Sequence, residues 1–273
     1  MRSAQLPPLS VQRLRALLRA AGGFWRVEFK PETGSTSDDA RKALESASVA
    51  GTAFLTDFQT AGRGARGRRW LAPPRSSLLM SAVLDVANVS KPFVFTQLGA
   101  LALCTGLRES TGLDVRIKWP NDAVVGLRKI GGALVEVVET GAGRVAIVGL
   151  GANLNFRSDE IGPVETPATS VLDETGSPCN REAVACAVLS ELARRLGRIG
   201  EQAAFTSEWE ALSAVKGERV EVRTERRTVR GRVRGFGPEG ELILQADDGS
   251  QSRFWAGRVS VRQTAGEPGN PGS

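Results

Sequence analysis

The order of apolar and polar residues predicts alternating helices and strands over the first part of the chain. Residues 11–20 have the spacing of a short amphipathic helix, and residues 24–29 that of a strand leading into a turn at 31–34. A helix then begins near residues 35–37, whose hydroxyl groups suit an N-cap, with Asp38 and Asp39 in its first turn. Further on, strands are expected at residues 52–58 and 77–85 and a helix at 93–109.

A series of short β-like runs follows. They lie at residues 115–119, 123–125, 132–138 and 145–155, and Pro-Asn-Asp and glycine-containing turns separate them. This pattern predicts an antiparallel meander. The expected fold class is therefore α+β, with a mixed, largely antiparallel sheet and helices packed on one face.

The composition changes near Val215, which predicts a second domain. Before it, a polar connection at residues 156–180 leads to two helices at 181–198 and 203–212. After it come about five short strands with Gly-Pro-Glu-Gly and Asp-Asp-Gly-Ser turns, as in a small β-barrel. We expect four segments: an N-terminal helical segment (1–23), a large domain (24–214), a β-barrel (215–264) and a disordered tail (265–273).

The residue types present exclude several kinds of chemistry. The chain has no histidine, which rules out Ser-His-Asp and Cys-His nucleophiles and histidine-bearing zinc sites. Its three cysteines never approach C-x-x-C spacing, so we expect reduced thiols and no bound metal. No run is long enough for a membrane helix and no signal peptide is evident, so the expected location is the cytoplasm.

The net charge of +6 is concentrated in two zones. Residues 216–234 hold eight basic residues against three glutamates, which suits either a solvated strand face or a surface for an acidic partner or nucleic acid. Residues 61–80 hold five arginines and no acid, with glycines between them. We expect these arginines and the glycine N–H groups to point at one region and to bind a phosphate or carboxylate.

The same loop matches G-x-G-x-x-G at residues 62–67, but its surroundings exclude the known nucleotide loops. A dinucleotide fold needs a helix at the glycines, whereas Pro73 and Pro74 and then a strand follow. A Walker A loop needs Lys and Ser or Thr where Arg68 and Arg69 stand. The protein kinase loop is excluded because the catalytic-loop histidine is missing.

Two further stretches place polar groups and glycines beside buried strands. Residues 118–122 read Lys-Trp-Pro-Asn-Asp and residues 129–134 read Lys-Ile-Gly-Gly-Ala-Leu, which suits either a polar hairpin or a binding turn. Residues 148–155 again mix glycine and asparagine into an apolar run. That pattern alone favours a β-bulge.

Taken together, these stretches resemble the biotin protein ligase family. The resemblance rests on residues 34–37, on Gln59 with residues 62–70, on the turn at 118–122 with 129–134, and on residues 149–155, in the family's order. It implies an SH3-like C-terminal barrel and an ATP-dependent two-step reaction. Biotin is first activated to biotinyl-5'-AMP and is then transferred to a lysine of a biotin carboxyl carrier protein, with Mg²⁺ arriving with ATP and no resident metal.

The resemblance also implies roles for particular residues. Lys129, Arg63, Lys118 and Asp122 are expected to be catalytic. The expected biotin-binding residues are Ser35, Thr36, Ser37, Gln59, Arg63, Gly64, Ala65, Lys129, Gly132 and Gly149. The expected ATP-binding residues are Arg66, Arg68, Trp70, Asn121 and Asn153.

The chain departs from the family pattern at two positions, and other functions stay open. Family members often have a third basic residue in place of Ala65 and an asparagine in place of Ser37, so we expect a leakier adenylate intermediate. Few residues precede the first strand, so no direct DNA binding is expected; the resemblance allows a homodimer. The alternatives are a lipoate or octanoate ligase and a non-enzymatic basic nucleic-acid-binding protein.

Overall fold

The computed structural model describes residues 6–86, 93–141 and 143–261. A mixed seven-stranded sheet forms the larger part, in the order β1-β2-β3-β7-β6-β5-β4. Only β1 and β2 pair in parallel; the other neighbours are antiparallel, and β4 to β7 form the expected meander. The strands are β1 (Arg26–Thr33), β2 (Thr52–Gln59), β3 (Ser77–Asp85), β4 (Val115–Lys118), β5 (Asp122–Val125), β6 (Arg128–Thr140) and β7 (Gly143–Asn153).

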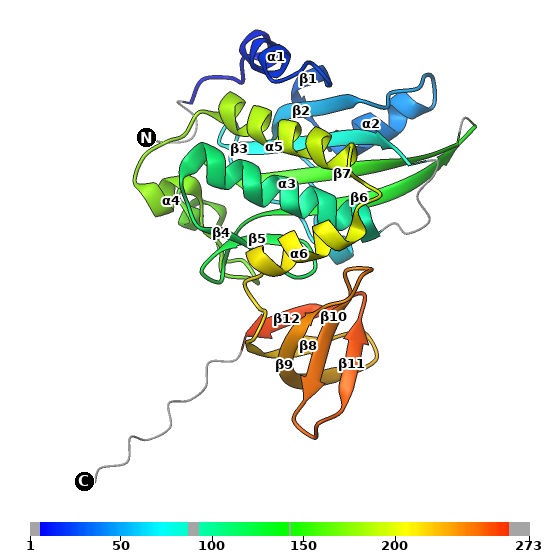
Figure 1. Ribbon diagram of the computed structural model, residues 1–273. Helices are drawn as coiled ribbons and strands as arrows, with labels where there is room; N and C mark the ends of the chain where they lie inside the picture. Colours follow the sequence, from blue (N-terminus) through cyan, green and yellow to red (C-terminus); the bar gives the residue numbers. More distant parts are fainter. Residues whose placement is uncertain (1–5, 87–92, 142, 262–273) are drawn as a thin grey trace.

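Helices α3 (Phe93–Thr111) and α5 (Arg181–Leu196) lie side by side on one face of this sheet, with α1 (Val11–Ala20) next to α5 (Figure 1). Most of α3 is buried because it lies between the sheet and α5. Gly106 allows this close packing, since a Cβ there would lie 2.7 Å from Val188 of α5. The apolar layer on this face is the main core of the protein.

Helix α2 (Thr36–Leu44) packs on the opposite face of the sheet. Ala40 of α2 contacts a small cluster that includes Phe54, Val83 and Ile147, whereas the alternate residues of the same strands face the main core. The helices predicted on one face are therefore accompanied by the short α2 on the other. Its N-terminus lies beside Ser81 of β3 and Gly149 of β7.

One local prediction was wrong and another was incomplete. The turn expected at residues 31–34 is largely strand, because β1 continues through Pro31 to Thr33; a proline is tolerated there since β1 is an edge strand. The connection at residues 156–180 contains a 3-10 turn (Ser158–Ile161) and α4 (Val171–Thr175). Ser170 caps α4 by accepting a hydrogen bond from the Asp173 N–H (3.0 Å).

The C-terminal part is a five-stranded antiparallel sheet in the order β11-β10-β9-β8-β12. Helix α6 (Gln202–Leu212) precedes it, and the tail predicted at residues 265–273 lies outside the described residues. The domain boundaries at residues 24 and 215 stay predictions. The strands are β8 (Arg219–Arg223), β9 (Thr228–Phe236), β10 (Leu242–Ala246), β11 (Gln251–Phe254) and β12 (Arg258–Val261).

This C-terminal sheet, the barrel, contacts the larger part at the turn between β4 and β5. The buried Trp119 donates its indole N–H to the carbonyl of Gly240 (3.0 Å). Arg258, at the start of β12, forms an ion pair with Glu165 in the loop before α4. Across the described residues, no helix is both long and apolar enough to span a membrane.

Candidate functional site

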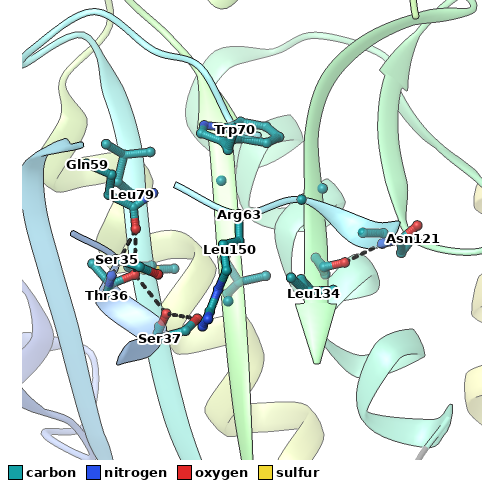
Figure 2. Close-up of a pocket in the computed structure, with 18 of the residues that line it drawn as sticks. Ser35, Thr36, Ser37, Gln59, Arg63, Trp70, Leu79, Asn121, Leu134 and Leu150 are labelled. Carbon is teal, nitrogen blue, oxygen red and sulfur yellow. Dashed lines mark hydrogen bonds between the residues drawn. The ribbon is translucent and has the colours of Figure 1, made fainter. Parts of the chain in front are cut away.

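A pocket lies where the N-terminus of α2 meets the central strands β3, β7 and β6 (Figure 2). Thr36, Ser37 and Gln59 gather along one side of it, Trp70 lies across its top, and Leu134 and Asn121 lie on the other side. The pocket brings together all the residues predicted to bind biotin: Ser35, Thr36, Ser37, Gln59, Arg63, Gly64, Ala65, Lys129, Gly132 and Gly149.

Glycines of β6 and β7 form the floor of this pocket, because they have no side chains to fill it. The strand register places Gly149 of β7 between Ser81 of β3 and Leu134 of β6. The next row on the same face places Gly151 between Leu79 and Gly132. These residues pair in regular register, so the bulge expected near residues 148–155 is absent from the described strand pairing. The glycines instead leave space for a ligand.

Gly151 also explains the position of Trp70. A Cβ at Gly151 would lie 2.8 Å from the Trp70 ring, so only glycine allows the indole to lie this close to β7. The indole N–H of Trp70 is buried and has no partner among the described residues. Trp70 therefore offers an unused hydrogen-bond donor and a flat apolar face at the top of the pocket.

A buried hydroxyl network forms the polar side of the pocket. The N–H and the hydroxyl of Thr36 donate to Gln59 Oε1 at 2.9 and 3.2 Å. Ser81 Oγ lies 2.8 Å from Thr36 Oγ1 and 2.9 Å from Ser37 Oγ. Ser35 is the N-cap of α2, yet its side chain makes no capping hydrogen bond. The hydroxyl of Ser35 is therefore available for a ligand.

The sequence prediction omitted Ser81. It is buried in β3, within the apolar run Leu-Leu-Met-Ser-Ala-Val-Leu. Its hydroxyl forms hydrogen bonds with the hydroxyls of Thr36 and Ser37. A lone hydroxyl in a buried strand was the available signal, but it did not reveal which residues lie next to it.

A second hollow adjoins this pocket, and Lys129 lies between the two. Lys129, Trp70, Gly64 and Ala65 line both spaces. The ammonium of Lys129 lies 5.6 Å from the centre of the Trp70 ring and forms an ion pair with Asp122. The Lys129 and Asp122 side chains are only 21% and 19% exposed, so little water screens this pair. Asp122 thus holds the Lys129 ammonium at the boundary between the two spaces.

The second hollow contains only part of the predicted ATP-binding set. Arg68, Trp70 and Asn153 line it, together with the loop that includes Val164 and Thr166. Asn153 is buried and donates to the carbonyl of Thr169 (3.0 Å), which fastens this loop to the end of β7.

Arg66 and Asn121 lie elsewhere. Both line a third cavity at the junction with the barrel, and Asn121 also lines the first pocket. The Asn121 side chain donates to the carbonyl of Ala133 (2.5 Å), so it holds the β4–β5 turn against β6. Arg66 and Asn121 thus lie outside the second hollow, although the resemblance grouped them with Arg68, Trp70 and Asn153.

Lys118 lines the third cavity with Asp122 and not the first pocket. Burial lowers the pKa of the Lys118 ammonium, while nearby Asp122 partly opposes this effect and Arg258 and Lys129 add to it. Lys118 therefore loses its proton more readily than an exposed lysine.

The arginines of the loop do not point at one region, contrary to the sequence-based expectation. Arg63 lies 2.8 Å from Asp38 and 3.3 Å from Glu136, Arg68 lies 3.8 Å from Glu165, and Arg69 donates to the carbonyl of Thr60 (3.2 Å). The backbone turns at Arg66 (φ 61°) and Gly67 (φ 72°) and sends successive side chains in different directions. Nearby carboxylates and carbonyls then hold the guanidinium groups of Arg63, Arg68 and Arg69.

The described residues contain no group of three His, Cys, Asp or Glu side chains that could hold a metal ion. Burial raises the pKa of Cys104, Cys179 and Cys186, that of Cys179 to about 11. All three are free thiols. None of them lines the three cavities described above.

Comparison with known proteins adds independent information. Residues 32–153 match the family model of the biotin/lipoate A/B protein ligase family, and residues 216–262 match the biotin protein ligase C-terminal domain. A biotin--[acetyl-CoA-carboxylase] ligase from Mycobacterium tuberculosis is 30% identical, over 87% of this chain and 90% of that protein. One from Paracoccus denitrificans is 31% identical, over 80% and 94% of the two chains.

A solved structure shows the same architecture. The biotin protein ligase from Aquifex aeolicus, in complex with biotin and ATP, superposes with a TM-score of 0.75. The two chains are 27% identical, and the match covers 88% of this chain and 99% of the other.

Proposed function

The chain belongs to the biotin protein ligase family, and from this premise we propose that it activates biotin with ATP and transfers the biotinyl group to a lysine of a carrier protein. The position of Lys129 carries this proposal. Its ammonium lies between the glycine-floored pocket and the neighbouring hollow, where the carboxyl end of one ligand would meet the α-phosphate of another.

The glycine-floored pocket suits biotin. The ring system of biotin has a polar ureido edge and an apolar body, and the pocket has hydroxyl and amide groups on one side and aliphatic walls elsewhere. Thr36, Ser37 and Gln59 supply the donors and acceptors for the ureido edge. The valeryl chain of biotin would then run toward Lys129.

The second hollow suits ATP. Trp70 offers a stacking surface for the adenine ring, while Arg68 and Asn153 offer polar contacts. In the first step, a carboxylate oxygen of biotin attacks the α-phosphorus, the bond to the bridging oxygen breaks, and pyrophosphate leaves. Lys129 stabilises the negative charge that develops at the α-phosphate. Mg²⁺ enters with the phosphates of ATP.

The second step needs an uncharged lysine amine. The amine attacks the carbonyl carbon of the biotinyl-adenylate, the bond from that carbon to the phosphate oxygen breaks, AMP leaves, and the nitrogen gives its extra proton to water. Asp122 lines the cavity beside this point, and its carboxylate can orient the incoming amine while it remains paired with Lys129.

The reaction indicates the partner, and the free thiols indicate the location. We propose a biotin carboxyl carrier domain as the acceptor and the cytoplasm as the location, a compartment in which the three free thiols would stay reduced. The absence of direct DNA binding and the homodimer stay predictions. The named relatives support biotin rather than lipoate as the substrate, and they give no support to the nucleic-acid-binding alternative.

Biotin-dependent exchange between ATP and pyrophosphate tests the first step. The Lys129→Ala variant should lose about a hundredfold in this rate, on the order of 3 kcal/mol of transition-state stabilisation. The exposed Lys42, in α2, provides a control: Lys42→Ala should retain the wild-type rate. Exchange that proceeds with lipoate but not with biotin, or that is unaffected by Lys129→Ala, would overturn the proposal.

A further inference from the structure

The junction between the barrel and the larger part contains a third cavity, of which the two steps described above use only Arg68 and Asp122. Arg66 and Arg68 of the arginine loop, Lys118 and Asp122 of the β4–β5 turn, and Trp255 and Arg258 of the barrel line it. In Figure 1 the barrel lies directly below this part of the large sheet. Both structural parts therefore build the cavity.

This junction cavity adjoins both substrate spaces. It shares Asn121, Ala133 and Leu134 with the glycine-floored pocket, and Arg68 and Thr166 with the second hollow. Ala65 lines all three spaces. A side chain that enters through the junction cavity thus arrives where the carboxyl end of biotin and the α-phosphate meet.

Trp255 lies at the mouth of this cavity, in the segment between β11 and β12, and its side chain is 52% exposed. An exposed tryptophan beside a cavity has the features of a binding hot spot, because the large flat ring loses much contact with water when a partner covers it. It has no place in either substrate space.

The charges around the cavity define the kind of partner. Arg66, Arg68, Lys118 and Arg258 are basic, against the carboxylates of Asp122 and Glu165. Arg66 is exposed and forms no ion pair with any described residue. A basic rim around an exposed aromatic ring complements an acidic protein surface.

We propose that the junction cavity, with Trp255 at its mouth, is the docking surface for the carrier domain, which inserts its acceptor lysine past Lys118 and Asp122. The carrier presents acidic side chains to the arginines and packs an apolar residue on Trp255. This inference rests on the proposed ligase function, because it needs a partner with an acceptor lysine. It assigns to the barrel a direct part in recognising that partner.

The Trp255→Ala variant tests the inference when the two half-reactions are measured separately. Transfer from preformed biotinyl-adenylate to a purified acidic carrier domain should show a KM for the carrier raised at least about tenfold. Biotin-dependent pyrophosphate exchange should stay within about twofold of wild type. The carrier KM of the wild type should rise with ionic strength, and Trp255→Phe should restore most of the loss.

Phe24 provides a matched control, since it is also 52% exposed. It lies just before β1, which is the edge strand at the opposite end of the large sheet from β4. Phe24→Ala should leave the carrier KM unchanged, and the thermal midpoints of both variants should stay close to wild type.

Three results would overturn the inference. They are an unchanged carrier KM in Trp255→Ala, an equal loss in both half-reactions, and a change only in the oligomeric state, which would assign Trp255 to contact with a second copy of the chain. Failure of the proposed function is distinct from these results. It would appear as a wild-type protein without biotin-dependent exchange.

Discussion

Ser81 links the chemistry of the pocket to the stability of the fold. Its hydroxyl is buried in β3 and contacts the hydroxyls of Thr36 and Ser37 at the start of α2. Thr36 in turn donates to Gln59 of β2, so one network connects a helix N-terminus to two strands. Ser81 is therefore a positioning residue for the groups that face the ligand.

The Ser81→Ala variant should raise the KM for biotin severalfold and lower the free energy of unfolding by about 1 kcal/mol, because two buried hydroxyls lose a partner. Ser77, on the same strand, is also buried, but its hydroxyl has no partner among the described residues. Ser77→Ala should therefore leave the free energy of unfolding unchanged or slightly higher. Urea unfolding and steady-state kinetics measure both, and equal effects of the two variants would contradict the assigned role.

At the scale of elements, the loop between β9 and β10 joins the barrel to the β4–β5 turn through a hydrogen bond. The carbonyl of Gly240 accepts the indole N–H of Trp119, whose neighbours Lys118 and Asn121 line the junction cavity. Gly240 has φ +80°, and a Cβ there would lie 2.4 Å from Phe93 Cε1 and 2.6 Å from Gln97 Nε2. Only glycine fits both the backbone conformation and the space.

Gly249 is a control that separates the cost of close packing at Gly240 from the cost of backbone strain. It has φ +83° in the turn between β10 and β11, and nothing lies within 4 Å of its missing Cβ. Gly249→Ala should cost about 1 kcal/mol of unfolding free energy through strain alone. Gly240→Ala should cost a further 1–3 kcal/mol, roughly the usual penalty for overpacking. Chemical denaturation measures the difference, and equal costs would show that the contact contributes little.

At the scale of the whole molecule, the three cavities adjoin one another and are lined by segments far apart in the chain. Ala65 lines all three cavities, and their other lining residues come from β6, β7 and the barrel. A ligand that fills two of the spaces contacts more of the molecule than a ligand that fills one. Biotin and ATP together should therefore stabilise the fold more than either does alone.

Thermal unfolding with biotin, with ATP and with both measures this effect. A ligand at a hundredfold excess over its Kd adds about 2.7 kcal/mol to the free energy of unfolding. The midpoint should rise by several degrees with the pair and by less with biotin alone. Lipoate in place of biotin should give little change; a shift as large as that with biotin would restore the lipoate ligase as an alternative.

Much of the secondary structure followed from local pattern. The predicted strand at residues 77–85 coincides with β3, and the helix predicted from residue 93 is α3 with two more residues at its end. Periodicity succeeds here because burial on one face or on all faces acts on each element separately. The short α4 and the continuation of β1 through Pro31 were missed, because the hydrogen bonds of Ser170 and the edge position of β1 depend on neighbours.

The amino-acid sequence by itself determined which residues are able to do the chemistry: without histidine, the work falls to lysines, carboxylates, hydroxyls and glycine backbones, and their motifs already indicated one pocket. Only the tertiary structure decided which of these side chains lie next to one another. The strand order β3-β7-β6 sets Ser81, Gly149 and Leu134 in one row, and packing of the barrel places Trp255 in the same cavity as Lys118. Side-chain types and periods are local properties, whereas lateral neighbours depend on register and packing between segments far apart in the chain.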